Sequence, residues 1–462
     1  MTAPRTTAPL SADYFAPLLA ATLSNAAASP LYSVDPAWAA GYQEYLASGS
    51  LREVPFFTKQ LYRDRSAGIE QPADVIVQHT KGTTGEVTFR YRRAADIAFV
   101  SGVNAAIHEI DDSHGLLAPL VLRELDGSHG QSLAGGSRHP GLTTSGDPRG
   151  FRRAVHLLTH RFAIAGVQEH VSVVSGRLRF LIVLAMTLEA EGVSPGSLGV
   201  STLLTYGSFI SPYWRDWLER TWQATLLDCY SLSEILGSAS HCPQCGRYRF
   251  DEPTVYAEFA DPASGEPVPS GWAVPVLTEL VPYVCHEPFV RYWTDDLVLV
   301  DNAPCCGPGA FAFKGRLPSA VRDLAASPPR ILVPWAELVE VLERTDRLVW
   351  DIDPLDWGTR DGRVTARLAR SPAEVPRLST AAYDADGRRR VELTVTLHPG
   401  ASTANDNRVA EDLRDRLLSN SSLLARAVRG NEYDLVVRAV RDPAPSPARP
   451  EARSFVNRVG VT

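Results

Sequence analysis

The sequence predicts an α/β protein: a large N-terminal domain of layered sheets and helices, followed by a small, mobile α+β C-terminal domain. Within 170–237, apolar runs of strand length alternate with amphipathic runs of helical length, which is the order of a layered α/β chain. After 316 the pattern changes to helix-like runs around one long alternating run. A length of 462 residues also exceeds one ordinary core. We therefore expect domains at 1–316 and 317–462, the second ending in a Pro-rich tail.

Individual segments support this division. Residues 11–70 have the pattern of broken helices, and 73–102 alternate like two strands around a Gly-Thr turn. The segment 135–150 is loop by its Gly, Pro and Ser content. Further along, "SPYWRDWLERTW" is predicted to be a helix with Ser211 as its cap and Pro212 at its first position.

Composition argues against several function classes. The net charge of −7 disfavours nucleic acid or an anionic membrane as a main partner. No apolar run is long enough to span a membrane, and "MTAPRTTAPLSADYF" lacks the apolar core of a signal peptide, so a cytoplasmic location is expected. Positive charge is carried almost wholly by Arg. The lysines are Lys59, Lys81 and Lys314, which leaves few candidates for a catalytic lysine.

The cysteines suggest a metal site. In a chain expected in the cytosol, such a group indicates metal rather than disulfides. A C-x₂-C knuckle with a distant second pair is a common structural zinc pattern, here formed by Cys242, Cys245, Cys305 and Cys306. His241 is the reserve ligand if one of the adjacent cysteines points away. The alternative is buried apolar thiols, the role expected for Cys229 and Cys285 in the core or a pocket.

The turn "HTKGTTGE" at 79–86 lies between two strand-like runs. Glycine lets a backbone approach an anion closely, and hydroxyl and N–H groups donate to it, so the turn suits a phosphate-binding loop. An ordinary hairpin loop uses the same residue types. Both interpretations stay open for this stretch taken alone.

Five motifs occur in order: "HTKGTTGE" at 79–86, "LLTYGSFIS" at 203–211, "DCYSLSEILG" at 228–237, "FVRYWTDDLV" at 289–298 and "KGR" at 314–316. Together they resemble the ordered motifs of the adenylate-forming enzymes, most of all the phenylacetate–CoA ligase branch, over roughly residues 50–440. The resemblance implies that ATP and Mg²⁺ activate a carboxylic acid, aromatic or short-chain, through an acyl-adenylate, with CoA as acceptor. It also implies a homodimer, and it supports the zinc interpretation of the cysteines.

The resemblance assigns roles to single residues. Glu234 is implied as the Mg²⁺ ligand, and Thr83 and Thr84 as catalytic hydroxyls on the phosphates. Asp296 is implied at the ribose, where a carboxylate can accept from both sugar hydroxyls, with Asp295 as a competing candidate. The other nucleotide-binding residues that it implies are Thr80, Lys81, Gly82, Gly85, Tyr206, Gly207, Ser208, Asp228, Tyr230, Ser231, Ser233 and Arg316.

Some of these roles have a second interpretation. Lys81 either contacts phosphate or points to solvent. The stretch "YSLSE" also fits a helix N-terminus, with Glu234 in an acidic first turn. The acyl pocket is expected to draw on the segment 130–170, with His139, His156, His160 and Phe162 as its candidates.

Two departures from the family pattern matter. Leu317 and Pro318 follow "KGR" where relatives have an Asp or Lys hinge residue, and a proline there restricts backbone rotation. The tail "PARPEARSFVNRVGVT" has no counterpart of the family lysine that contacts the carboxylate and the α-phosphate. Its candidate replacements are Arg449, Arg453 and Arg458, although Arg and Lys are not interchangeable.

Three functions therefore stay open. The chain is an acid–CoA ligase, an amide-forming ligase that passes the acyl group to an amine, or a catalytically degenerate nucleotide-binding relative that acts through a partner. A binding module has no need of a Mg²⁺ ligand beside the α-phosphate. Retention of the Thr-rich loop and of Glu234 therefore favours an enzyme.

Overall fold

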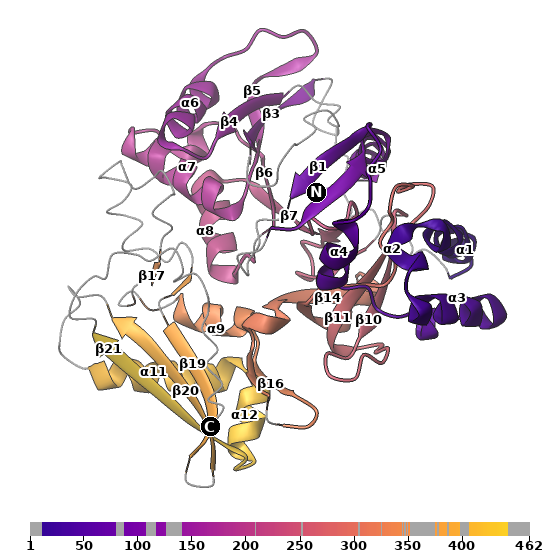
Figure 1. Cartoon of the computed structure of the whole chain (residues 1–462). Coiled ribbons are helices and arrows are strands. Elements are labelled where there is room, and N and C mark those ends of the chain that lie inside the picture. The colour runs from indigo at the N-terminus through magenta and orange to yellow at the C-terminus, as the bar shows by residue number, and fades with distance from the viewer. Residues whose placement is uncertain are drawn as a thin grey trace.

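The computed structural model describes residues 12–79, 87–107, 117–125, 141–207, 209–250, 253–303, 305–324, 326–343, 345, 348, 350–351, 375–376, 378–385, 388–397 and 406–441. The predicted phosphate loop at 80–86 lies outside these residues, and so do Ser208, His139 and the C-terminal tail with Arg449, Arg453 and Arg458. The α/β prediction is confirmed (Figure 1).

In the described part of the chain, twelve strands form one large sheet. Its parallel part runs in the order β4-β3-β5-β6-β7 and contains β3 (Ala118–Leu125), β4 (Gly141–Ser145), β5 (Val167–Ser175), β6 (Thr202–Tyr206) and β7 (Thr225–Ser231). The helices packed with it are α6 (Pro148–Thr159), α7 (Leu178–Ala190) and α8 (Pro212–Trp222), with a short turn η4 (Pro195–Ser197) before β6. The carboxyl ends of these strands meet at one edge, where ligands of open α/β sheets bind.

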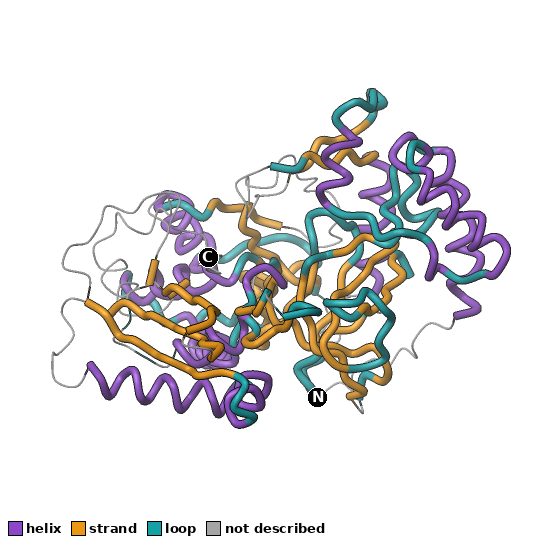
Figure 2. The backbone as a smooth tube through the Cα atoms, turned by 60° about the horizontal axis from the view of Figure 1, so that its bottom comes forward, coloured by secondary structure: helices purple, strands orange, loops and turns teal. Residues whose placement is uncertain are grey.

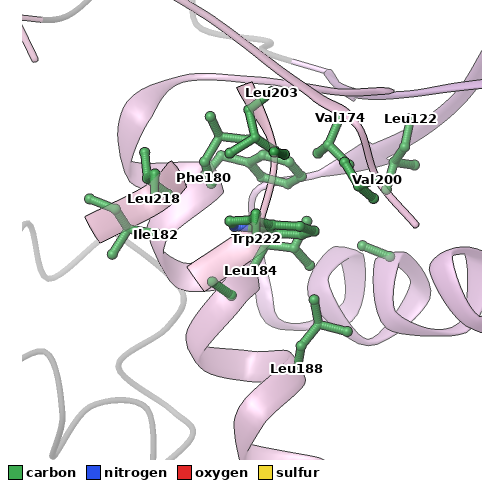
Figure 3. Close-up of a cluster of buried hydrophobic side chains, with 14 of the residues drawn as sticks. Leu122, Val174, Phe180, Ile182, Leu184, Leu188, Val200, Leu203, Leu218 and Trp222 are labelled. Atoms are coloured by element: carbon green, nitrogen blue, oxygen red, sulfur yellow. The ribbon is translucent and has the colours of Figure 1, made fainter. Parts of the chain in front are cut away.

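The core of this part lies between the helices and one face of the sheet. Because α7 is apolar on nearly every side, it is buried along its length rather than along one stripe. Trp222 of α8 packs in the same cluster as Phe180 and Leu203 (Figure 3). This core holds the parallel strands in place.

The rest of the sheet is antiparallel. It continues from β7 through β8 (Ser238–His241), β9 (Tyr248–Arg249), β14 (Gly307–Arg316), β13 (Asp296–Ala303), β11 (Gly271–Glu279) and β10 (Val255–Ala260), with β12 (Tyr292–Trp293) paired to β11. The hairpin β13–β14 therefore belongs to the same sheet as the parallel strands and is linked to β7 through β8 and β9.

The N-terminal segment is a set of short helices: α1 (Ala12–Ala28), α2 (Pro30–Ser33), α3 (Pro36–Ser48), η1 (Leu51–Glu53) and α4 (Lys59–Ser66). Asp35 caps α3 by accepting from the N–H groups of Ala37 and Trp38. A two-stranded ribbon follows, β1 (Val75–His79) and β2 (Phe89–Arg93), and then α5 (Ala94–Ile107). The prediction of broken helices followed by two paired strands is confirmed up to Arg93, but residues 94–102, expected to continue the strand pattern, lie in helix α5. None of the described helices is long and apolar enough to cross a membrane.

The C-terminal region has its own core. Its elements are η5 (Leu317–Ser319), β15 (Val321–Asp323), β16 (Arg330–Val333), α9 (Trp335–Leu342), β17 (Trp350–Asp351), β18 (Val375–Pro376), β19 (Leu378–Ala385), β20 (Arg388–Leu397), α11 (Asp406–Asn420), α12 (Ser422–Arg429) and β21 (Tyr433–Arg441). Strand β20 pairs antiparallel with β19 and parallel with β21, and residues of α9, α11 and α12 belong to one hydrophobic cluster with residues of this sheet. Figure 2 shows the backbone coloured by secondary structure, with helices beside the strands of this region. This arrangement fits the predicted α+β unit, while the boundary at 316/317 stays a prediction.

Candidate active site

Glu234 lies in the turn between β7 and β8, past the carboxyl end of β7. Its side chain is buried, and its Oε1 is 2.7 Å from the Nζ of Lys59 at the start of α4. Ser233 Oγ donates to its Oε2 at 3.1 Å. Burial alone would raise the pKa of Glu234, but the charges of Lys59 and Arg316 hold it below its usual value. The carboxylate is therefore ionised at neutral pH.

A buried, ionised carboxylate at this edge of the sheet suits Mg²⁺, which takes oxygen ligands and leaves positions for substrate phosphates. The alternative of a helix N-terminus at "YSLSE" is wrong. After Ser233 and Glu234 the chain turns and returns as β8, so no helix follows.

Two arginines of β2 fix the same turn. Arg90 Nε donates to the carbonyl of Glu234 and Arg92 Nη2 to the carbonyl of Ser233, each at 3.3 Å. Both guanidiniums are almost fully buried and pair with Glu279 of β11, at 2.8 and 3.0 Å. The ribbon that carries the predicted phosphate loop is thereby attached directly to the turn that carries Glu234.

The carboxylate of Glu279 accepts hydrogen bonds from four groups. Besides the two arginines it accepts from the N–H groups of Leu236, at 2.9 Å, and Phe289, at 3.0 Å. Burial opposes its ionisation, but the two guanidiniums hold its pKa below the usual value. Sequence reasoning missed Glu279, Arg90 and Arg92, because charged residues in a strand are usually taken for a solvent face.

Asp296 forms a second group of charges at the site. It opens β13 opposite Arg316, the last residue of β14, with Arg316 Nε 3.2 Å from its Oδ1. Tyr230 donates its hydroxyl proton to Oδ2 at 2.7 Å. Burial raises the pKa of Asp296 to about 6, against the opposing charge of Arg316. Asp295 is turned away in a left-handed conformation and accepts from the indole of Trp293 at 2.9 Å.

The remaining predicted nucleotide residues lie at the same edge. Gly207 adopts a φ of 70° directly after β6, which a glycine allows without strain. Tyr206 is paired with Cys229 in the β6–β7 ladder, and Ser231 ends β7. Asp228 accepts from the hydroxyl of Tyr248 and from its neighbouring N–H, and burial raises its pKa to about 6. Its contact with a nucleotide stays a prediction.

The expected contribution of His156 and His160 to the acyl pocket stays a prediction. Helix α6 starts after β4, at the carboxyl edge of the sheet, and runs back toward the opposite edge. Its last turn therefore places both histidines, which are exposed, away from Glu234. Phe162 packs against the core between the helices and the sheet. A helix reverses the direction of its strand, and composition alone does not reveal this.

The four predicted metal ligands come together. Cys242 and Cys245 lie in the turn between β8 and β9, and Cys305 and Cys306 in the turn between β13 and β14. All four Sγ atoms lie within 4.8 Å of one another, with Sγ–Sγ distances of 3.7 Å (242–305), 3.5 Å (245–306) and 3.8 Å (305–306). Thiolates about 2.3 Å from a tetrahedral zinc lie roughly 3.8 Å apart, so the donor set fits this metal.

The surroundings of the cluster affect its thiols differently: burial and the neighbouring thiols raise the pKa of Cys245 and of Cys306, whereas the pKa of Cys242 is lowered. Burial alone would raise the pKa of Cys242, but the N–H groups of Cys245 and Gln244 lower it to about 7. His241, the reserve ligand, does not belong to this group of four cysteines, and its ring packs on Tyr248. Cys285 is exposed, so the expectation of a core or pocket thiol there is wrong.

The chain has the fold of the adenylate-forming ligases, as the five motifs predict. A solved structure of 2-hydroxyisobutyryl-CoA ligase, in an open conformation with 2-HIB-AMP and CoA, matches with a TM-score of 0.66 at 18% identity, covering 97% of this chain and 91% of that chain. O-succinylbenzoate coenzyme A synthetase from Bacillus subtilis, in complex with ATP and magnesium ion, matches with a TM-score of 0.51 at 13% identity, over 82% of this chain and 70% of that chain.

Sequence similarity is more limited. A phenylacetate-coenzyme A ligase from Pseudomonas putida is 35% identical over 132 residues. The match spans 26% of this chain and 27% of that relative, about a quarter of its length. No protein-family model matches the chain. The chain is thus structurally similar to acyl-CoA ligases, with a distant, partial match to the phenylacetate branch.

Proposed function

We propose that this chain is an AMP-forming ligase that activates a carboxylic acid with ATP and transfers the acyl group to CoA. The observation that carries the proposal is the convergence at one sheet edge of the Glu234 turn, the ribbon of the predicted phosphate loop and the Asp296–Arg316 pair. Joining a carboxylate to a triphosphate requires donors and cations that offset the repulsion between two anions.

In the proposed reaction the residues have distinct roles. Asp296, with Arg316 and Tyr230 behind it, accepts from the ribose hydroxyls, and Thr83 and Thr84 donate to the phosphates. Glu234 would hold Mg²⁺, which would neutralise charge on the phosphates. The fixed ribbon and turn keep the acid and the α-phosphate aligned, because effective concentration depends on orientation.

The substrate acid is proposed to be aromatic or short-chain, as the motifs imply. The relatives named above act on 2-hydroxyisobutyrate, O-succinylbenzoate and phenylacetate by their names, which spans both kinds. An amine is the alternative acceptor, because Pro318 stands at the proposed hinge, where it would restrict the rotation that precedes transfer to CoA. The protein is also proposed to be a homodimer and to lie in the cytoplasm.

Carboxylate-dependent ATP–pyrophosphate exchange tests the proposal. A panel of aryl and short aliphatic acids is assayed, followed by AMP formation with CoA or with amines. We expect exchange with at least one acid, and loss of this exchange in Glu234→Gln. Exchange that persists in Glu234→Gln would contradict its role at Mg²⁺. ATP binding without exchange for any acid would favour the degenerate relative.

We also propose that the four cysteines hold one structural zinc. All four positions of a tetrahedral ion would be taken by Cys242, Cys245, Cys305 and Cys306, which leaves none open for substrate. The ion would join the turn after β8 to the turn after β13. Both hairpins extend toward the nucleotide residues, so this zinc would stabilise the site from a distance.

A further inference from the structure

Lys59 lies outside the five sequence motifs, so they give it no role. Its ammonium pairs with Glu234 at 2.7 Å, and its side chain is only 20% exposed. The Lys59 ammonium makes no other ion pair or hydrogen bond among the described residues. An ammonium has three N–H donors, so two remain for another acceptor. A partly buried lysine beside the proposed Mg²⁺ ligand is therefore available to an anion.

The backbone around Lys59 is fixed to the large sheet. Phe57 donates its N–H to the carbonyl of Arg291 and accepts from the N–H of Trp293, each at 2.9 Å. Thr58 caps α4 by accepting from the N–H of Leu61. Lys59 thus enters the site from a segment that is hydrogen-bonded to the strand just before Asp296.

Arg63 extends the same basic face. It follows Lys59 by one helical turn, so both side chains lie on one side of α4. Its Nε donates to Oγ1 of the buried Thr88 at 2.6 Å, two residues after the phosphate loop. Figure 1 shows α4 beside the β1–β2 ribbon and the antiparallel strands. One face of α4 therefore carries two cations: Lys59, which contacts Glu234, and Arg63, which contacts Thr88.

We infer that Lys59 supplies the cation that adenylation requires and that the C-terminal tail lacks. This inference rests on the proposed function. Lys59 binds the α-phosphate and the substrate carboxylate, while Arg63 holds Thr88 just before β2. A carboxylate oxygen attacks the α-phosphorus, the bond to the bridging oxygen of pyrophosphate breaks, and pyrophosphate leaves with the electron pair. No proton is transferred, and Lys59 stays an ammonium throughout.

Lys59 and the arginines of the tail differ in which part of the chain holds them. The family lysine belongs to the C-terminal region, whereas Lys59 is held by the large sheet. Adenylation here then does not depend on Arg449, Arg453 or Arg458. Replacing those three residues together should spare ATP–pyrophosphate exchange, and replacing Lys59 should not.

The test compares full-length Lys59→Met, Lys59→Arg and Lys59→Ala with Arg52→Met and with the triple variant Arg449→Gln, Arg453→Gln, Arg458→Gln. Arg52 is a matched control, because it pairs with Glu266 in an exposed position. We expect kcat of exchange to fall about 100-fold in Lys59→Met, the usual loss for one transition-state donor. Lys59→Arg retains part of the activity, and both controls stay within about twofold.

Two readouts distinguish a catalytic Lys59 from a structural one. Added ethylammonium should restore part of the exchange in Lys59→Ala, since it returns a cation to the space. Transfer to CoA from supplied acyl-adenylate should be little affected in Lys59→Met, because that half-reaction comes after the step in question. Equal losses in both half-reactions would overturn the inference.

The inference and the proposed function can fail separately. Exchange in Lys59→Met within threefold of the unaltered chain would overturn only the role of Lys59. Loss of exchange in the triple variant, with Lys59→Met still active, would assign the cation to the tail instead. No exchange in the unaltered chain with any acid would overturn the proposed function, and this inference with it.

Discussion

Charged side chains of the candidate site are buried in pairs. Glu279 lies between Arg90 and Arg92, and Glu234 lies against Lys59. Taking charges out of water costs about as much as their attraction returns, so such pairs add little net stability. Removing one partner is different, because the other charge is then buried alone. The pairs therefore fix the positions of the site's side chains, and the stability of the protein is sensitive to replacement of either partner.

Glu279→Gln should destabilise the protein. It removes the counter-charge of two guanidiniums that are 1–2% exposed, and breaking a buried pair costs about 3–5 kcal/mol. Urea unfolding monitored by tryptophan fluorescence measures the loss. Glu266→Gln is the matched control, since Glu266 pairs with Arg52 at the surface, and we expect it to change the free energy of unfolding by less than about 1 kcal/mol. Equal effects of the two substitutions would refute the argument.

Asp296 should make stability depend on pH. Burial raises its pKa from 3.8 to about 6, so between these values the folded state binds a proton that the unfolded state has lost. The free energy of unfolding then falls as pH rises through this window, by at most about 1.4 kcal/mol per pH unit. Asp228, whose pKa is also raised to about 6, acts in the same direction.

The difference between the unaltered protein and Asp296→Asn isolates the effect of Asp296. Chemical unfolding at pH 4, 5, 6 and 7 should show a shallower decline for the variant, because Asn does not titrate. Parallel curves for the two proteins would mean that Asp296 keeps an ordinary pKa in the folded state.

At the scale of elements, local patterns predicted many strands and turns, but two predictions are wrong: residues 141–145, expected in a loop, form β4, and residues 94–102, expected in a strand, lie in α5. Gly207, the four clustered cysteines and the end of β7 were all identified from short stretches of sequence. Contacts between distant segments were not predicted, because Lys59 meets Glu234 only through the packing of α4 on the sheet. The direction of α6, which carries His156, was also not predicted.

The two turns that carry the four clustered cysteines should depend on each other for their stability. If they hold zinc, purified protein contains about one zinc per chain, and Cys242→Ser lowers both the zinc content and the melting temperature, because metal binding is coupled to folding. Cys285→Ser is the matched control, since Cys285 is exposed and outside the cluster. Elemental analysis and calorimetry measure the two effects. Metal-free protein prepared without chelators would disprove the zinc site.

At the scale of the molecule, the proposed boundary between the two domains falls where β14 ends. Leu317 donates its N–H to the carbonyl of Asp295 at 2.7 Å, so the first residue after the boundary is tied to the large sheet. Beyond it, the C-terminal core is a separate cluster. Any reorientation between the half-reactions would have to use the few residues between this hydrogen bond and β15.

Pro318 lies in that short segment, at the start of η5. Its ring fixes φ near −65°, which removes one of the few torsions available for domain rotation. Pro318→Ala should therefore leave ATP–pyrophosphate exchange within about twofold and raise the rate of acyl transfer to CoA, if rotation limits that step. The two half-reactions are measured separately, the second from supplied acyl-adenylate. Ser319→Ala is the matched control, because it changes a neighbour without changing φ. A loss of exchange in Pro318→Ala would show that the proline supports the adenylation site rather than restrains rotation.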